Sequence, residues 1–365
     1  MKVMTVVGAR PQFIKTAVLS RELARIGVEE SLVHTGQHYD DAMSEVFFRE
    51  LAIQPPAHNL GIGSGTHGEQ TGRMLEALER VMLAERPERV LVYGDTNSTV
   101  AAALCAAKLA VPIDHIEAGV RSFDHDMPEE VNRIITDQLA DQLYCPTATA
   151  VSNLAREGVC DGVHHAGDVM LDLAIDCRTS ALALSLPGGL REGEYFVATV
   201  HRPSNTEDAD RLAALMRALD EVASTGSPVV LPAHPRLARR IASHPSLGGA
   251  VRVIEPVGYL EMQGLILRAR GVITDSGGVQ KEAAFHGVRC ITLRDSTEWP
   301  ETVSCELNVL LGDDLASLAE QARECGGRSD PPAQLLREFG GGTAAARIAG
   351  LIVDRGGARR RWRRR

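Results

Sequence analysis

Three acidic residues stand at the ends of predicted elements, where carboxylates can carry acid–base chemistry. Asp95 lies between two apolar runs, 91–93 and 100–106, which predict a buried strand and an Ala-rich helix. Glu117 ends the next predicted strand, and Glu129 opens the helix that follows. The carboxyl ends of parallel strands meet at one edge of a sheet, so we expect these three side chains to converge there.

Converging carboxylates predict a pair of groups that can exchange protons with a substrate. Crowding of like charges raises the pKa of at least one of them, as a general acid requires. Taken alone, Asp95 has three interpretations: a catalytic base, a metal ligand, or an N-cap of the helix that starts beside it. The presence of Glu117 and Glu129 at neighbouring element ends favours acid–base chemistry for Asp95.

Two cations flank the first predicted helix, which spans about 11–26 after a strand at 3–7. Arg10 and Lys15 lie beside the free backbone N–H groups of that helix start, and this combination suits a diphosphate. The alternative, surface charges on an amphipathic helix, remains open at this point.

A second phosphate signal follows the predicted strand at 271–274. Gly277 and Gly278 let backbone N–H groups approach a phosphate closely, and Ser276 adds a hydroxyl. Glu282 lies one turn further on and is placed to accept from a ribose hydroxyl. No Lys-Ser/Thr follows the glycines, so this is not the phosphate loop of an ATPase.

His201 and Arg202 end another predicted strand, at 195–200. A His-Arg pair at a strand end favours a functional site facing a diphosphate over a structural histidine. The glycines at 63, 65 and 68 match a dinucleotide pattern formally, but they follow a Pro-rich segment and not a strand. We therefore expect no nicotinamide cofactor, and no residue spacing indicates a metal.

These residues require an α/β fold with two Rossmann-like halves and a central cleft between their strand ends. Strand–helix alternation runs through both halves, and the polar segment 178–193 is expected to link them. We expect an N-terminal catalytic-carboxylate domain at 1–172, a nucleotide-binding domain at 173–345, and a helix end and tail at 346–365. The further strands are predicted at 31–35, 111–116, 228–231, 251–254 and 290–293, and the chain is expected to return to the sheet between 137 and 145.

Composition excludes several classes of protein. The 365 residues are 44% hydrophobic and 24% charged, as in a globular protein of two domains. No apolar run is long enough to cross a membrane, and the N-terminus reads as a strand and not a signal peptide. Seven cysteines without metal spacing predict reduced thiols and a cytoplasmic location.

The net charge of −9 argues against nucleic-acid binding by the body of the chain. Six of the last seven residues, 359–365, are arginines. An Arg-rich tail can bind polyanions, but we expect a disordered tail with little effect on function.

Six motifs, in order over roughly residues 1–345, resemble those of the non-hydrolysing UDP-N-acetylglucosamine 2-epimerases. The resemblance implies a GT-B-like fold whose C-terminal helix returns to the first domain, and interconversion of UDP-GlcNAc and UDP-ManNAc. It also implies a UDP-sugar as the ligand and a homodimer. The motifs lie at 8–15, 94–96, 115–119, 128–133, 201–202 and 275–282.

The resemblance gives each motif residue a role. The implied catalytic group is Asp95, Glu117, Glu129 and His201. The implied substrate-binding group is Arg10, Lys15, Arg133, Arg202, Ser276, Gly277, Gly278 and Glu282.

The chain also departs from the commonest form of the motifs. Gln12 and Lys281 stand where many members have acidic residues, and the segment 37–40 differs from the one through which bacterial members are activated by their own substrate. These forms resemble a subgroup that includes UDP-2,3-diacetamido-glucuronate 2-epimerases. We expect UDP-GlcNAc as the substrate, with the diacetamido-uronate as the alternative. For the uronate, Arg202 or Lys281 would supply a cation near C6.

The bond chemistry supports epimerisation by elimination. The C2 hydrogen of a 2-acetamido sugar has no adjacent carbonyl to make it acidic. Elimination of UDP across C1–C2 to a 2-acetamidoglucal, and re-addition with the proton on the other face, would invert C2. Three other classes remain possible: a GT-B glycosyltransferase, a hydrolysing epimerase, and a non-catalytic UDP-sugar sensor.

Overall fold

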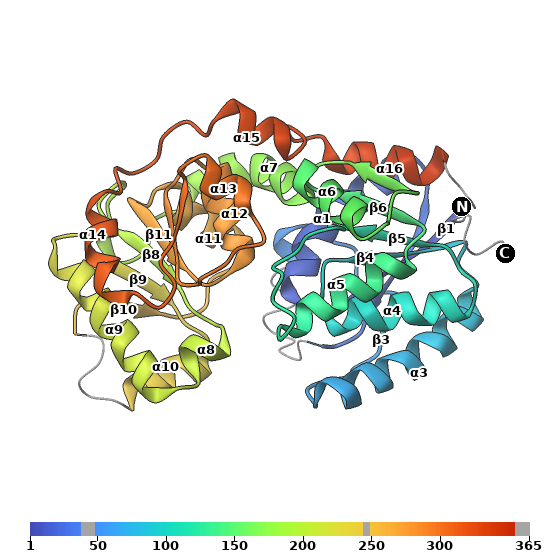
Figure 1. Cartoon of the computed structure of the whole chain (residues 1–365), viewed down its shortest axis with the longest axis horizontal. Helices are drawn as coiled ribbons and strands as arrows, with labels where there is room; N and C mark the ends of the chain where they lie inside the picture. Colours follow the sequence, from blue (N-terminus) through green and yellow to red (C-terminus); the bar gives the residue numbers. More distant parts are fainter. Residues whose placement is uncertain (38–47, 244–248, 355–365) are drawn as a thin grey trace. The chain divides into compact units, whose positions relative to one another are not determined.

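The structure, a computed structural model, describes residues 1–37, 48–243 and 249–354. It divides into two units, each built on its own parallel sheet (Figure 1). Unit 1 is Met1–Leu173 together with the chain from Arg337 onward, and unit 2 is Ala174–Leu336. The segment 337–345 therefore belongs to the first unit, whereas we expected it in the second. Helix α16 (Ala344–Asp354) packs against α1 (Arg10–Arg25) of unit 1.

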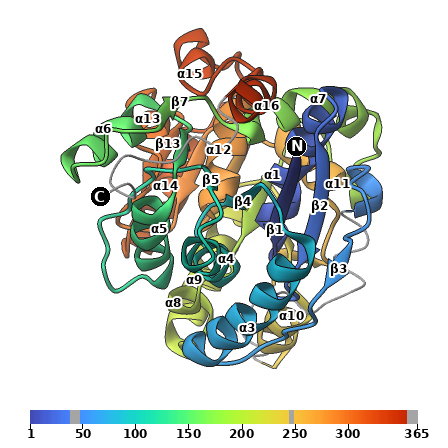
Figure 2. The same cartoon turned by 90° about the vertical axis from the view of Figure 1, so that its right-hand side faces the viewer.

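The sheet of unit 1 has seven strands in the order β3-β2-β1-β4-β5-β6-β7, and every neighbouring pair is parallel. Figure 2 shows its inner strands β1, β4 and β5 beside helix α4. The strand order reverses between β1 and β4, and ligands of such sheets bind at that point. The strands are β1 (Lys2–Val7), β2 (Glu29–His34), β3 (His58–Asn59), β4 (Arg89–Tyr93), β5 (Ile113–Ile116), β6 (Gln142–Cys145) and β7 (Val163–His165).

Helices connect these strands, and their starts carry the sequence signals expected of helix N-termini. α4 begins after a Thr cap, and α5 begins at a proline, whose missing N–H costs nothing at a first helical position. α7 runs to Ala183, so the expected linker at 178–193 is wrong in its first third. Alanines and leucines near its end extend this helix. After α1, the helices of unit 1 are α3 (His67–Glu85), α4 (Asn97–Lys108), α5 (Pro128–Leu139) and α6 (Ala148–Arg156). Helix α7 (Val169–Ala183) begins in unit 1 and continues into unit 2.

The sheet of unit 2 has six parallel strands in the order β10-β9-β8-β11-β12-β13. Its order reverses between β8 and β11, so the same rule predicts ligand binding after these two strands. The strands are β8 (Phe196–Thr199), β9 (Val229–Pro232), β10 (Arg252–Ile254), β11 (Gly271–Thr274), β12 (Cys290–Thr292) and β13 (Asn308–Leu310). Its helices are α8 (Pro203–Thr206), α9 (Ala209–Ser224), α10 (Pro235–Ala242), α11 (Tyr259–Leu267), α12 (Gly277–Phe285), α13 (Pro300–Ser304), α14 (Leu318–Arg323) and α15 (Ala333–Glu338).

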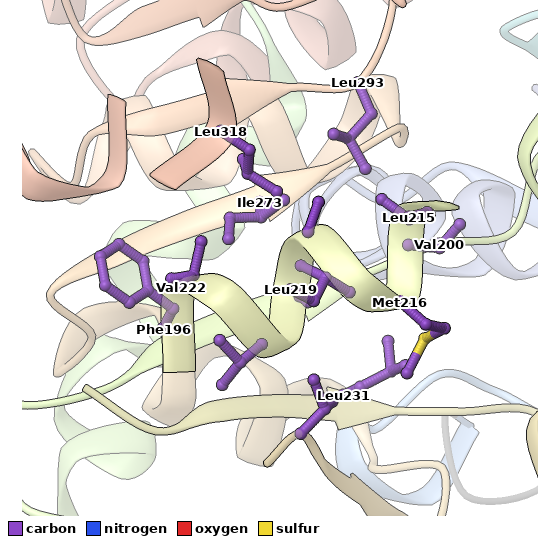
Figure 3. Close-up of a cluster of buried hydrophobic side chains, with 14 of the residues drawn as sticks. Phe196, Val200, Leu215, Met216, Leu219, Val222, Leu231, Ile273, Leu293 and Leu318 are labelled. Carbon is purple, nitrogen blue, oxygen red and sulfur yellow. The ribbon is translucent and has the colours of Figure 1, made fainter. Parts of the chain in front are cut away.

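A hydrophobic cluster holds one face of this second sheet. Leu215, Leu219 and Val222 of α9 point toward strand residues such as Phe196 and Ile273 (Figure 3). Their three- and four-residue spacing makes the apolar stripe that a helix needs to cover a sheet. Such burial contributes roughly 1.5–3 kcal/mol for each large apolar side chain. It keeps the strand ends, and the turns that follow them, in fixed positions.

Every strand predicted in the described residues is present, and three further strands are added. β3, β7 and β13 escaped prediction because each is only two or three residues long, too short to show a periodic pattern. All three lie at sheet edges, where strands are commonly short.

Candidate active site

In unit 1, Asp95 lies in the turn after β4 and does not cap the helix that follows. The N-cap of α4 is Thr96, whose hydroxyl accepts from the Thr99 N–H at 3.3 Å while the Thr99 hydroxyl accepts from the Thr96 N–H at 3.2 Å. This reciprocal capping satisfies the helix start without the carboxylate. The capping interpretation of Asp95 is therefore wrong.

Asp95 is held by a guanidinium. Its Oδ2 atom accepts from Nη2 of Arg133 at 2.6 Å and from Nε at 3.0 Å. The side chain of Arg133 is 7% exposed and that of Asp95 25% exposed, so the pair lies at the surface of the site with the carboxylate outward. Asn132 also fixes the turn, because its side-chain amide donates to the backbone oxygen of Asp95 at 2.9 Å.

Glu117 is held by Lys15 from the other side of the strand-order reversal. Lys15 Nζ lies 2.5 Å from Glu117 Oε1, and both side chains are at most 10% exposed. Glu117 adopts a left-handed backbone with φ of +69°, which is uncommon for a residue with a side chain and marks functional sites. Gly94 has φ of +59°, which residues with side chains rarely adopt, and a Cβ there would lie 3.1 Å from Lys15 Nζ, so the pair would have to shift.

Glu129 occupies a different place from the other two carboxylates. It is exposed in the first turn of α5, while its neighbour Glu130 is buried. Glu130 Oε2 accepts from Arg133 Nη1 at 2.7 Å and from the Ser122 N–H at 2.9 Å. Asp95 and Glu117 each face a cation, and the expected crowding of the three carboxylates stays a prediction.

Glu130 is a site residue that sequence reasoning missed. Burial raises the pKa of its carboxyl, but the Ser122 N–H and the Arg133 guanidinium outweigh this and hold the pKa below its ordinary value. The available signal was its spacing of three residues from Arg133, which places both on one face of α5. Glu130 orients the guanidinium that holds Asp95.

Gln12 joins the two turns at the strand-order reversal. Its side-chain oxygen accepts from the N–H groups of Gly8 and Ala9 at 2.7 and 3.1 Å. Its amide nitrogen donates to the Tyr93 carbonyl at 2.9 Å and the Thr99 hydroxyl at 3.0 Å. A carboxylate cannot make both sets of bonds, so this departure from the motif has a structural use.

His201 is positioned in unit 2 by a buried carboxylate, Asp275. His201 Nδ1 lies 2.8 Å from Asp275 Oδ1, and the backbone N–H groups of His201 and Arg202 also donate to Asp275. Burial raises the pKa of Asp275, but these bonds and the charge of His201 hold it lowered. Asp275 accepts the hydrogen bond from Nδ1–H of His201. The other ring nitrogen, Nε2, is left for a ligand, since the ring is 63% exposed. Sequence reasoning placed Asp275 in the motif without a role.

The start of α12 has the geometry expected of a phosphate site. Ser276 is the N-cap, accepting from the Val279 N–H at 3.5 Å, and Gly277 and Gly278 form the first turn and are partly exposed. Orphan N–H groups at such a start bind anions. Glu282 lies on the same helix and is 4% exposed.

Arg202 and Lys281 differ in accessibility. Arg202 is 26% exposed; its Nε donates to the Asp275 carbonyl at 3.2 Å, and Nη2 lies 3.8 Å from Glu298. Lys281 is 1% exposed, and its Nζ lies 3.8 Å from the centre of the Trp299 ring. Lys281 is therefore much less accessible than Arg202, and the role near C6 given to either stays a prediction.

Arg10 is the first residue of α1 and is half-buried, with its diphosphate role still a prediction. Among the residues described, no group of three His, Cys, Asp or Glu could hold a metal ion. No helix in the same ranges is long and apolar enough to cross a membrane. The segment at 38–40 and the arginine tail at 359–365 lie outside the described residues.

Comparisons with known proteins agree with this geometry. Residues 21–353 match the family described as UDP-N-acetylglucosamine 2-epimerase. UDP-2,3-diacetamido-2,3-dideoxy-D-glucuronate 2-epimerase of Pseudomonas aeruginosa is 50% identical over 97% of this chain and 99% of its own. The solved structure of Methanocaldococcus jannaschii UDP-GlcNAc 2-epimerase with UDP-GlcNAc and UDP is 37% identical, with a TM-score of 0.89 over 97% of this chain and 100% of that one.

The fold is shared more widely. The glycosyltransferase SnogD of Streptomyces nogalater, 15% identical with a TM-score of 0.61 over 97% of this chain and 99% of its own, shares the two-sheet architecture alone. The fold is thus GT-B-like, as expected. The family match covers most of the chain, including the site residues from Asp95 onward, and this chain therefore belongs to the UDP-N-acetylglucosamine 2-epimerase family as a nucleotide-sugar 2-epimerase.

Proposed function

We propose that this chain inverts C2 of UDP-2,3-diacetamido-2,3-dideoxy-glucuronate, the alternative of our sequence analysis. The observation that carries the proposal is the 50% identity, over nearly the whole of both chains, to a relative named for that substrate. The Methanocaldococcus jannaschii UDP-GlcNAc 2-epimerase, solved with UDP-GlcNAc and UDP, is 37% identical. The better match thus favours the uronate over UDP-GlcNAc, our first expectation.

Arg202 is the residue that fits a uronate. A guanidinium binds a carboxylate through two parallel N–H groups, and Arg202 keeps part of its surface exposed beside His201. Buried Glu298 is already held by Arg294 through two bonds of 2.8 Å. Because Arg294 already balances the charge of Glu298, Arg202 can bind the C6 carboxylate without leaving Glu298 unpaired.

The proposed chemistry uses two sets of residues. The start of α12 and His201 bind the diphosphate, and the carboxylates Asp95, Glu117 and Glu129 act on the sugar. The C1–O bond breaks and UDP leaves with its electron pair, while a carboxylate takes the C2 proton and the C1=C2 bond forms. Re-addition of UDP and delivery of a proton to the opposite face complete the inversion, with no net change of atoms.

The uronate itself restricts the route. Its C3 carries an acetamido nitrogen and no hydroxyl, so oxidation of C3 to a ketone is not available as a way to make C2–H acidic. Elimination needs instead a well-held leaving group and acid–base groups beside C2. Asp95, Glu117 and Glu129 supply those groups. We assign no single carboxylate to one face of the sugar.

The test compares kcat/KM for the two UDP-sugars, with the products resolved by chromatography. We expect the uronate to be preferred by at least about tenfold, roughly 1.4 kcal/mol of transition-state binding. Arg202→Gln should lower kcat/KM for the uronate and leave that for UDP-GlcNAc much less changed. Arg236→Gln, which alters an exposed arginine paired only with Glu207 at 3.6 Å, is the control.

The second candidate is UDP-GlcNAc, favoured by the TM-score of 0.89 to the epimerase solved with that ligand. Equal turnover of the two nucleotides, or a preference for UDP-GlcNAc, would transfer the function to this candidate. Release of free UDP as the main product would indicate a hydrolysing enzyme. Product only in the presence of a sugar acceptor would indicate a glycosyltransferase.

A further inference from the structure

A buried chain of charged groups lies beneath the two carboxylate-bearing turns of unit 1. Asp137 of α5 and His115 of β5 are both 0% exposed, and His115 Nδ1 lies 2.7 Å from Asp137 Oδ1. The other ring nitrogen, Nε2, lies 2.8 Å from the carbonyl oxygen of Gly94. His115 thus connects α5 to the turn that carries Asp95.

The second oxygen of Asp137 holds the neighbouring turn. Asp137 Oδ2 accepts from the Gly119 N–H at 3.1 Å and from Arg121 Nη1 at 2.7 Å. Gly119 follows Glu117 by two residues, and both have left-handed backbones, with φ of +76° and +69°. A carboxylate that fixes this turn also fixes the strained backbone that directs the Glu117 side chain.

We propose that Asp137 is a positioning residue for both catalytic turns, and that it acts on the Asp95 turn through His115 held as an imidazolium with both ring nitrogens donating. The inference rests on the proposed function, since it assigns Asp137 to the same reaction. Neither Asp137 nor His115 reaches the surface, so neither is offered as a group that touches the substrate.

The protonation follows from the partners of the ring. A backbone carbonyl accepts and cannot donate, and an ionised carboxylate likewise only accepts. A neutral ring would therefore turn one lone pair toward an acceptor at 2.7–2.8 Å. A proton on Oδ1 of Asp137 would relieve this, but the guanidinium of Arg121 and the Gly119 N–H, both on Oδ2, favour the ionised carboxylate. Burial raises the pKa of Asp137, yet the charges and bonds of His115 and Arg121 outweigh burial and lower it.

Charge balance makes this arrangement tolerable in the interior. Arg121 is also bound to Glu157 through two contacts of 2.7 Å, so the imidazolium and guanidinium face two carboxylates. Buried charges persist where they are paired and hydrogen-bonded in this way. With His115 on Oδ1 and with Arg121 and the Gly119 N–H on Oδ2, the single carboxylate of Asp137 is linked to both the Asp95 turn and the Glu117 turn.

The first test is Asp137→Asn in the full-length enzyme, with Asp114→Asn as the matched control. Asp114 precedes His115 on β5, is also 0% exposed, and binds Arg89 at 2.5 and 2.8 Å and the Tyr144 hydroxyl at 2.9 Å, and not the backbone of either turn. An Asn at 137 must turn its amide donors toward His115 or toward Gly119 and Arg121. We expect kcat of folded Asp137→Asn to fall at least about 100-fold with the Kd of UDP within about threefold, whereas folded Asp114→Asn loses Tm but keeps kcat.

A second pair of variants covers the case in which Asp137→Asn does not fold. His115→Gln keeps a donor that can reach the Gly94 carbonyl, and His115→Leu removes it. We expect His115→Gln to retain more kcat than His115→Leu. Wild-type kcat in His115→Leu or in folded Asp137→Asn would overturn the inference.

The third readout does not depend on activity. In protein labelled with ¹⁵N-histidine, the His115 ring, identified by its absence in His115→Gln, should show two protonated nitrogens at neutral pH. A ring with one unprotonated nitrogen would overturn the imidazolium. If the wild type epimerised neither UDP-sugar, the proposed function would fail while this spectrum still decided the protonation state.

Discussion

Lys15 Nζ lies 2.5 Å from Glu117 Oε1, across the point where the strand order of the first sheet reverses. The ammonium fixes the direction of the Glu117 carboxylate, which the proposed reaction uses to exchange a proton with the substrate. Asp95 stands in the same relation to Arg133. Each of these carboxylates therefore comes with its own cation, a pairing that sets the following expectations.

Glu117→Gln and Asp95→Asn should each lower kcat by at least about 100-fold, the usual scale of a general acid–base contribution. The amide keeps the shape of the side chain and removes its proton chemistry. Binding of UDP, measured by calorimetry, should stay close to wild type, because the start of α12 is unchanged and the amide still offers an oxygen to Lys15 or Arg133. An amide variant with more than half of the wild-type kcat would remove that residue from the catalytic group.

The neighbours Glu129 and Glu130 should separate activity from stability. Glu129 is exposed, so Glu129→Gln should lower kcat while Tm stays within about 1 °C, as for surface changes generally. Glu130 is 1% exposed and bound to Arg133 and Ser122, so Glu130→Gln should lower Tm by several degrees. Thermal unfolding and initial rates measured on the same samples decide the matter; the reverse pattern would exchange the two roles.

Stability should depend on pH through Glu130. The pKa of this carboxyl is lower in the folded protein than its ordinary value of 4.5, so the unfolded chain binds the proton more readily. The stabilisation is complete above about pH 4.5 and is lost as the pH falls through the lowered value. The difference in free energy of unfolding between wild type and Glu130→Gln should shrink over that range. A difference that grows on acidification would contradict the assignment.

Gly277→Ala tests the proposed phosphate site without disturbing the fold. A Cβ at this position would lie 3.4 Å from Glu298 Oε2 and from Trp299 Nε1, which is ordinary contact distance. Alanine is also a better helix former than glycine. We expect an unchanged or higher Tm together with a Kd for UDP raised about tenfold, because the methyl group keeps the phosphate from the N–H groups. Unchanged UDP affinity would place the diphosphate elsewhere.

Sequence patterns predicted the strands and the turns well, and the side-chain partners poorly. The apolar run ending at Tyr93 identified β4, and the residues at its end identified a site. Nothing local showed that Asp95 would pair with Arg133, 38 residues away, because such pairing depends on how strands order in the sheet. The pairing of Lys15 with Glu117 escaped prediction for the same reason, because the two residues lie 102 residues apart in the chain.

The buried partners were the least visible. Asp275 and Asp137 read as ordinary polar residues near a strand end and on a helix, yet each collects several donors. Such a carboxylate is recognisable only when its donors are placed in space, because they lie in a distant stretch of chain, 201–205 for Asp275 and 115–121 for Asp137. The identity of the substrate depends on still finer detail, since Arg202 and Lys281 looked equivalent until burial separated them.

The last prediction concerns the bond that breaks. If UDP is eliminated and re-added, the C1–O bond is cleaved in every turnover, and an isotope placed in the bridging oxygen should scramble into the non-bridging oxygens of the β-phosphate. Product formed in heavy water should carry deuterium at C2, because the carboxylate that takes the proton exchanges it with water.

The uronate provides an internal control for that label. Its C5–H lies beside the C6 carboxylate, so non-specific proton loss would also introduce deuterium at C5, whereas elimination across C1–C2 labels C2 alone. Small amounts of UDP and of the glycal should appear on long incubation. Glu117→Gln and Asp95→Asn should slow scrambling and C2 labelling together, since both follow from one cleavage. Full epimerisation with the bridging oxygen retained would show that the elimination mechanism is wrong.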